Sequence, residues 1–197
     1  MVSFLTKEKI LKAAINQYSL YNYHGATMKK IADEVNIKPA SIYFFYKNKE
    51  ELFLAAFKWI LESHFNYIRN IMGEVIEQPI LNIYKTIIRK TVAYHSERQN
   101  ETNAYISLIN SPPAEIKPFL HHHMQRFDSW MEQILTEQMQ KEYPNISEEK
   151  IIKITKQFLI IMDGIFWEIN LYEKEELERQ IEYAINIIEC LLREEVK

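Results

Sequence analysis

The chain has one cysteine, three glycines and six prolines among its 197 residues. A single cysteine, Cys190, excludes a disulfide within the chain and a zinc site built from several thiolates. We interpret Cys190 as a small buried residue of the last helix. A disulfide between the two Cys190 residues of a dimer is the minor alternative, because a reducing compartment disfavours it. Three scattered glycines exclude a glycine-rich phosphate loop. Because so few residues break helices, an all-α fold is predicted.

The chain also lacks a long hydrophobic run. Its longest apolar stretches, such as FLIIM at 158–162, are far shorter than the roughly 20 residues that span a bilayer. The first residues, MVSFLTKEK, have no apolar core of the kind that a signal peptide needs. We therefore expect a cytoplasmic protein with no membrane association.

Motifs for catalysis or metal binding are missing. No glutamate stands three residues before any of the six histidines, which excludes the Glu-x-x-His pairs of di-iron helical bundles. The consecutive His121, His122 and His123 would point about 100° apart on a helix, so a metal site there is not expected. We predict no catalytic residue, no metal and no cofactor.

The segment from Thr27 to Phe53 carries the most specific pattern. It begins with an expected N-cap at Thr27, followed by small or apolar residues at helical spacing, namely Met28, Ile31, Ala32 and Val35. A turn of about three residues, 36–38, then leads to a second helix starting at Pro39. These spacings predict two short helices around a tight turn, with a long helix after them.

The second short helix has a buried and an exposed side. Ile42 and Tyr46 are four residues apart, so both can pack against the first helix. Four residues are left facing outward, namely Ala40, Ser41, Tyr43 and Phe44. An exposed aromatic pair needs a partner, and a helix-turn-helix of this kind is typical of DNA recognition.

Over roughly the first 50 to 55 residues, the chain resembles the N-terminal domain of the tetracycline-repressor (TetR) family of transcription regulators. The matching residues are Gly25, Thr27, Ile31, Ala32, Val35, Ile42, Tyr43, Phe45, Tyr46, Lys49, Glu50 and Leu52. Three positions differ: Asn36 replaces the usual glycine, Lys38 a capping serine, and Phe45 a histidine or tyrosine. Asparagine tolerates left-handed backbone better than most residues, so the turn is expected to survive.

The resemblance implies a three-helix DNA-binding head at residues 1–50 and a helical ligand-binding and dimerisation bundle at residues 51–197. It implies a homodimer formed by the last two helices of each chain. The two recognition helices, one from each head, would lie about 34 to 36 Å apart and bind a palindromic double-stranded operator. The implied function is a repressor that a small apolar or aromatic effector releases from DNA. The alternative is a helical ligand-binding or interaction protein without specific DNA recognition.

The candidate DNA contacts are Thr27, Lys29, Lys38, Pro39, Ala40, Ser41, Tyr43, Phe44 and Lys49. Thr27 could present its hydroxyl to a phosphate or serve only as a helix cap. These lysines, together with Lys47, could neutralise phosphates or be merely solvated. Ser41 and Phe44 are suited to base edges, and Tyr43 resembles the family tyrosine that contacts the DNA backbone.

Charge is divided unevenly along the chain. Residues 1–50 hold eight lysines and four acidic residues, whereas the remaining 147 hold sixteen basic and twenty-three acidic residues. The head is therefore at +4 and the rest at −7, although the net charge is −3. A head at +4 predicts modest nonspecific DNA affinity, and a dimer would double its phosphate contacts.

Beyond the head, periodicity predicts helices at about 49–72, 80–98, 104–110, 118–143, 147–172 and 175–195. Gly164 lies inside the fifth of these, where a close helix approach, or else an ordinary kink or core contact, would explain it. Aromatic side chains that could line an effector pocket, or simply form the core, are Trp59, Phe65, Tyr84, Phe127, Trp130, Phe166 and Trp167.

Overall fold

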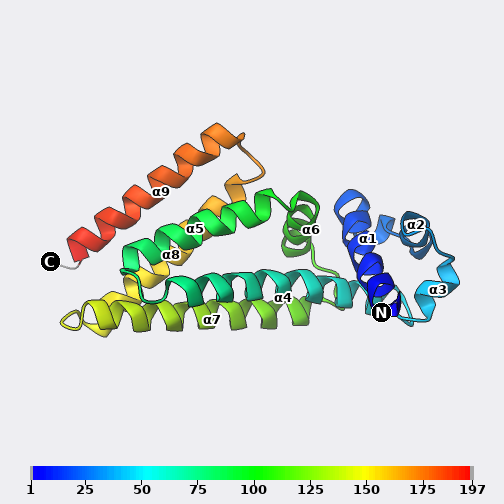
Figure 1. Ribbon diagram of the computed structural model, residues 1–197, viewed down its shortest axis with the longest axis horizontal. Helices are drawn as coiled ribbons and strands as arrows, with labels where there is room; N and C mark the ends of the chain where they lie inside the picture. The colour runs from blue at the N-terminus through cyan, green and yellow to red at the C-terminus, as the bar shows by residue number, and fades with distance from the viewer. Residues whose placement is uncertain (1, 196–197) are drawn as a thin grey trace. The chain divides into compact units, whose positions relative to one another are not determined.

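The computed structural model describes residues 2–195 and the side chains of residues 6–194. Within these residues every regular element is a helix, which confirms the all-α prediction (Figure 1). The helices are α1 (Val2–Gly25), α2 (Met28–Glu34), α3 (Pro39–Tyr43), α4 (Lys49–Val75), α5 (Ile80–Ser96), α6 (Gln99–Asn110), α7 (Lys117–Glu142), α8 (Glu148–Glu168) and α9 (Lys174–Glu195). None of the described helices is long and apolar enough to cross a membrane.

The chain divides into two compact units. Unit 1 comprises residues 1–65 and 98–124, and unit 2 comprises residues 66–97 and 125–197. Both α4 and α7 therefore supply residues to each unit. The expected functional division at residue 50 falls inside unit 1, at the start of α4, and stays a prediction.

Unit 1 forms around α1, which lies between α6 on one side and α2 on the other (Figure 1). Tyr18 of α1 is fully buried, and its ring meets the ring of Phe57 edge-on at 4.8 Å. Leu108 of α6 is buried in the same core. The aromatic and aliphatic residues of α1, the first half of α4, and α6 thus form one apolar core.

Unit 2 contains α5, α8 and α9 packed against one another. Tyr84 of α5 is fully buried and stacks on Phe158 of α8 with ring centres 4.0 Å apart. Lys85 of α5 pairs with Glu189 of α9 at 2.6 Å. An ion pair that solvent still reaches contributes little to stability. The docking of α9 therefore depends on its predicted apolar stripe, and the structure buries Leu177, Ile181, Ala184, Ile185, Ile188 and Leu192.

Three predicted helix ends are wrong by several residues. The helix α4 continues through Gly73 to Val75, because a single exposed glycine costs only about 1 kcal/mol in a long helix. The helix α6 begins at Gln99 rather than near 104, since the core buries Thr102 and holds this polar first turn in place. The helix α8 ends at Glu168 rather than near 172.

The expected burial of Cys190 is also wrong. Cys190 is exposed on α9, because α9 turns only its Leu177-to-Leu192 stripe toward its neighbours in unit 2. Periodicity predicted that stripe correctly, but Cys190 lies off it.

Candidate DNA-binding surface

The end of α1 brings the chain to the first short helix. Asn22 leaves the helical conformation (φ 53°, ψ −174°), and its Oδ1 accepts hydrogen bonds from the backbone N–H groups of His24 and Gly25 at 3.0 and 3.3 Å. A Cβ at Gly25 would lie 2.9 Å from the Cβ of Tyr21. Glycine is therefore needed at this position because Tyr21 comes too close for a side chain.

Thr27 begins α2 as predicted. Its backbone is extended (φ −113°, ψ 152°), and its Oγ1 accepts the backbone N–H of Lys30 at 3.2 Å. The apolar side of α2, formed by Met28, Ile31 and Ala32, is buried. The capping role of Thr27 is confirmed. Its side chain is also exposed, so the phosphate contact stays a prediction.

The turn after α2 depends on Asn36. Its φ is 60°, in the left-handed region expected of it. The N–H of Asn36 donates to the carbonyl of Asp33 at 3.1 Å, and the N–H of Ile37 donates to that of Ala32 at 3.0 Å. These two bonds form a Schellman motif, which glycine or asparagine closes with least strain.

The helix α3 has five residues and starts with Pro39 at a first-turn position. Ile42 is fully buried, whereas Tyr43 is 52% exposed and Phe44 is 83% exposed. Ala40 and Ser41 are exposed as well, so the predicted outward side is confirmed. Tyr46 is buried as expected, but it lies beyond the end of α3. Its N–H donates to the carbonyl of Ile42 at 3.0 Å.

Phe45 supports Phe44 from behind. The two rings meet at 5.2 Å and nearly at right angles. Phe45 is partly buried and packs against the core of unit 1. The apolar replacement at this position therefore steadies the exposed Phe44 ring against the core.

The candidate lysines differ in their surroundings. Lys29, Lys38 and Lys47 are exposed, as phosphate contacts require. The Nζ of Lys49 instead donates to the backbone carbonyl of Tyr23 and lies 4.5 Å from the centre of the Tyr23 ring. Burial lowers the pKa of Lys49. Lys49 thus holds the start of α4 to the end of α1, and a DNA contact by its ammonium stays a prediction.

Sequence reasoning missed the cap of α4. Asn48 Oδ1 accepts the N–H of Glu51 at 2.8 Å, and Glu51 Oε2 accepts the N–H of Lys47 at 2.8 Å. The spacing Asn-x-x-Glu ahead of an apolar run is a usable signal for such a cap. Burial, together with the charge of Glu51, raises the pKa of the neighbouring Tyr46 to about 12. These contacts fix the segment that joins α3 to α4.

The candidate effector residues belong to both units. Trp59 and Phe65 are in unit 1, and the others are in unit 2. Tyr84 is a core residue, with its hydroxyl 3.2 Å from the Sδ of Met139. The rings of Phe127 and Trp130 are 6.2 Å apart, and those of Phe166 and Trp167 are 5.8 Å apart. Their role in ligand binding stays a prediction.

The three consecutive histidines have different environments. His123 is buried, with Nδ1 3.6 Å from Glu62 Oε1, whereas His121 and His122 are exposed. Among the residues that the structure describes, no group of three or more potential ligands is placed to hold a metal ion.

The α2–turn–α3 arrangement, with its exposed α3 side and surrounding lysines, defines a helix-turn-helix DNA-binding protein. Residues 10–56 match the family model described as bacterial regulatory proteins, tetR family. The chain therefore carries the DNA-binding domain of this family in its N-terminal part, as its resemblance predicted. It is a transcriptional regulator and not an enzyme.

Relatives and solved structures agree with this assignment. The chain is 28% identical to the biofilm operon icaADBC negative transcriptional regulator IcaR of Staphylococcus epidermidis, over 78% of this chain and 80% of that protein. The Staphylococcus aureus IcaR is 27% identical, over 77% of this chain and 74% of that protein.

Two crystal structures share the fold at a TM-score of 0.72. One is the regulator FadR of Bacillus subtilis in complex with stearoyl-CoA, with 16% identity over 92% of this chain and 96% of that chain. The other is a TetR regulator of Haloarcula marismortui, with 18% identity over 94% of this chain and 97% of that chain.

Proposed function

We propose that the protein is a homodimeric repressor that binds a palindromic operator through α3 and leaves it when a small apolar or aromatic effector binds. The observation that carries DNA recognition is the exposure of Tyr43 and Phe44 directly beside the fully buried Ile42. This arrangement anchors α3 in the core and leaves its aromatic side for the major groove. Repression is supported by the relationship to IcaR, a negative regulator. Such a protein would act in the cytoplasm, where chromosomal DNA is.

Within this proposal, each candidate residue has a physical role. Ser41 and Phe44 would contact base edges, and Tyr43 the sugar-phosphate backbone. Pro39 and Ala40 would let the start of α3 approach the DNA closely. Lys29 and Lys38, both exposed, would neutralise phosphates, as would the N-terminal end of α2 at Thr27. Lys49 would act mainly by holding α4 in place.

Dimerisation would use the uncovered side of unit 2. Here α8 leaves Ile160, Gly164 and Trp167 exposed at spacings of four and three residues, and Ile160 is 69% exposed. Tyr183 and Ile187, four residues apart on α9, are also more than half exposed. A Cβ at Gly164 would meet nothing within 4 Å, so the space beside this glycine is open to a helix of a second copy. We call these five residues the outer face of α8 and α9.

DNA recognition requires that a second copy of the chain bind the outer face of α8 and α9. A single α3 of five residues covers few base pairs, and the head carries a charge of only +4. Two heads on one two-fold axis would double the phosphate contacts and read two half-sites. Exposed apolar side chains on two helices that pack together would form an apolar patch, and large exposed apolar patches mark interaction surfaces.

Release by an effector requires a link between its site and the head. The helix α4 starts six residues after the end of α3 and continues from unit 1 into residues of unit 2. An effector held by aromatic residues of unit 2 could therefore shift α4 and change the spacing of the two heads. The effector must bind the DNA-free state more tightly, because only differential affinity shifts an equilibrium. The stearoyl-CoA complex of FadR supports an effector with an elongated apolar part, such as an acyl chain.

The test of DNA binding is a fluorescence-anisotropy titration with the protein's own upstream intergenic DNA. A scrambled duplex of equal length is the control, and two salt concentrations are used. We expect specific, salt-sensitive binding of one dimer per site, and Phe44→Ala should weaken it at least tenfold. Leu20→Ala removes another exposed apolar side chain, from α1, which is 61% exposed, and should have no effect. Equal binding of both duplexes by the wild type would contradict operator recognition in this region.

The test of effector release adds a long-chain acyl-CoA, with stearoyl-CoA as the first probe, to the protein–operator complex. A fall in anisotropy, with saturable binding to the free protein, is the expected result. Tight binding of the probe without any change in operator affinity would refute the coupling for this class of ligand.

A further inference from the structure

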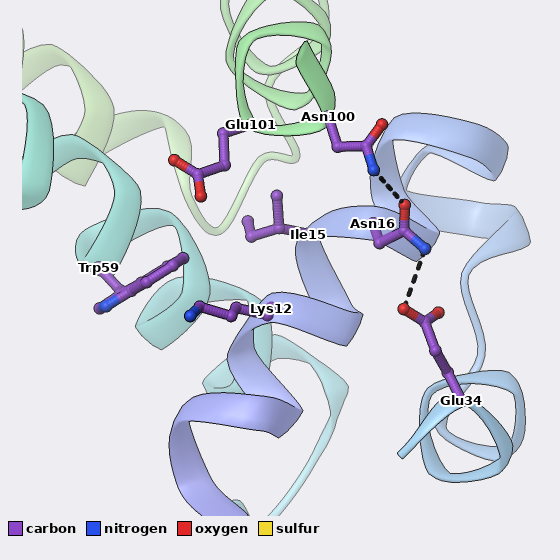
Figure 2. A pocket seen from close by; sticks show the side chains of 7 residues that line it. All are labelled: Lys12, Ile15, Asn16, Glu34, Trp59, Asn100 and Glu101. Carbon is purple, nitrogen blue, oxygen red and sulfur yellow. Dashed lines mark hydrogen bonds between the residues drawn. The ribbon is translucent and has the colours of Figure 1, made fainter. Parts of the chain in front are cut away.

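Unit 1 contains a partly open cavity of about 320 Å³ beside α1. Seven side chains line it, contributed by α1, α2, α4 and α6 (Figure 2). Ligand pockets commonly occupy about 300 to 1,000 Å³, so this cavity suits a small molecule. The exposed residues of α3 do not line it.

Glu34 provides one carboxylate at this cavity. Its Oε1 accepts from Asn16 Nδ2 at 2.9 Å, and its Oε2 accepts from Gln17 Nε2 at 2.7 Å. Asn16 is in turn held by Asn100, whose Nδ2 donates to Asn16 Oδ1 at 2.8 Å (Figure 2). Both of these hydrogen bonds to Glu34 come from uncharged amides. They orient the carboxylate without cancelling its charge.

Glu101 of α6 provides a second carboxylate. It makes no hydrogen bond to the other six lining side chains, all of which the structure describes (Figure 2). Burial raises the pKa of Glu101, and the charges of Arg98 and Lys12 oppose this only in part. A half-buried carboxylate of this kind is stabilised by a cation that reaches it.

Lys12 is the one cation among the lining residues, and it pairs with a carboxylate outside the cavity. Its Nζ lies 2.8 Å from Glu8 Oε1, four residues earlier on the same helix. Its side chain is largely exposed, and Nζ lies 5.8 Å from the centre of the Trp59 ring. Lys12 can therefore remain with Glu8 in solvent while another cation occupies the cavity.

The remaining walls are apolar. Ile15 of α1 and Trp59 of α4 lie on the same side of the cavity as Glu101 (Figure 2). The face of an indole attracts cations, and its edge packs against methylene groups. The cavity thus combines two carboxylates with an aromatic and an aliphatic wall.

We propose that this cavity is a second ligand site, which binds a short aliphatic diamine in its protonated form. One ammonium group meets Glu101, the second meets Glu34, and the methylene chain lies along Ile15 and Trp59. A primary ammonium fits because carboxylates accept its N–H hydrogens, whereas a quaternary ammonium has none to donate. An anion is repelled by the two carboxylates. This site goes beyond the proposed effector, which is apolar and is held by aromatic residues of unit 2; of the aromatic effector candidates, Trp59 alone lines this cavity.

The first experiment is isothermal titration calorimetry of the full-length protein without DNA, with 1,4-diaminobutane as the probe. We expect one saturable site per chain, weaker binding of butylamine and no binding of 1,4-butanediol. Glu101→Gln keeps the shape of the side chain and should weaken diamine binding at least tenfold. Glu115→Gln is the matched control, because Glu115 is exposed in the same unit and outside the cavity. It should bind the diamine as the wild type does.

The second measurement uses the wild-type protein, so it does not depend on the folding of a variant. In a ¹H–¹⁵N spectrum of the three tryptophans, the indole N–H signal of Trp59, assigned with Trp59→Phe, should be the one that shifts with the diamine. No saturable heat, equal binding by Glu101→Gln and wild type, or shifts in all three signals or in none would overturn the proposal. Because operator binding is measured separately, such results leave the proposed repressor function intact.

Discussion

The ammonium of Lys49, the first residue of α4, donates a hydrogen bond to the backbone carbonyl of Tyr23 near the end of α1. It also lies 4.5 Å from the centre of the Tyr23 ring. This contact holds the helix that leaves the helix-turn-helix against the helix that enters it. Lys49 therefore stabilises the scaffold of the DNA-binding surface and also contributes to the positive charge of that surface.

Lys49→Met keeps the aliphatic stem but removes the charge and the hydrogen bond. A bond from a charged group contributes about 1.5 to 3 kcal/mol when buried, and since Lys49 is only half-buried we expect a loss of about 1 kcal/mol in stability. Operator affinity should fall as well. Lys47→Met, at an exposed site, should lower only operator affinity and its salt dependence. Thermal unfolding and anisotropy would be measured on both variants, and an unchanged Lys49→Met melting curve would contradict the scaffold role.

Thr27→Ala removes the hydroxyl that caps α2 through the N–H of Lys30. Loss of such a cap costs about 1 kcal/mol, so the midpoint of urea unfolding should fall. Thr27→Ser keeps the hydroxyl and should retain nearly all of the stability. If alanine and serine proved equally stable, the cap would contribute nothing. Comparing their operator affinities would then show whether the hydroxyl also contacts phosphate.

Asn36→Ala places an ordinary side chain at a φ of 60°. This conformation costs a non-glycine residue about 1 to 2 kcal/mol, and asparagine already bears part of that cost. We expect alanine to destabilise the protein by about 1 kcal/mol, and glycine to be neutral or slightly stabilising. Chemical denaturation of the three proteins measures this order. A variant with alanine as stable as one with glycine would argue against the left-handed turn.

Because His64 is buried in its neutral form, we expect the protein to lose stability in mild acid. Its Nε2 is out of contact with solvent. Burial, and secondarily the nearby His123, lower the pKa of His64 from 6.5 to about 4. The unfolded chain therefore binds a proton near pH 6.5, whereas the folded chain binds it only near pH 4. The contribution of neutral His64 to the free energy of unfolding is fully present above pH 6.5 and is lost as the pH falls from 6.5 to 4.

Between pH 7.5 and pH 5, His64 should account for a decrease of about 2 kcal/mol in the free energy of unfolding. His64→Leu should shrink the pH dependence by about that amount, whatever it does to stability at pH 7.5. His122→Leu, at an exposed histidine of the same unit, serves as the control. Urea unfolding at the two pH values provides the comparison. An identical pH dependence in wild type and His64→Leu would rule out this origin.

Ile187→Glu tests the outer face of α8 and α9. Ile187 is 52% exposed within the chain, so a charge there should leave each protomer folded. In the proposed dimer the same charge would be buried without a partner, and such a burial costs several kcal/mol. Sedimentation velocity should therefore show monomers. Asn186→Glu adds the same charge to an exposed neighbouring position on α9 and should remain dimeric. A dimeric Ile187→Glu protein would move the interface elsewhere.

The helix-turn-helix could be predicted because its determinants are local. The cap at Thr27, the left-handed turn at Asn36, and the burial of Ile42 beside the exposed Phe44 depend on residues within a few positions of one another. Local hydrogen bonds and helical periodicity act over that same range. The apolar stripes of α8 and α9 were predictable for the same reason.

Other features depend on contacts between residues that are distant in the chain. Lys49 contacts Tyr23, which is 26 residues away in the chain. A lysine expected to contact DNA therefore also holds α4 against α1. The cavity beside Trp59 joins residues of four helices, and Asn16 and Asn100 are 84 positions apart. The periodicity of the sequence does not encode contacts between side chains so far apart in the chain. The sequence by itself determined the helices, their buried sides and the DNA-binding motif. Only the tertiary structure decided which polar side chains meet, because helix packing alone brings them together.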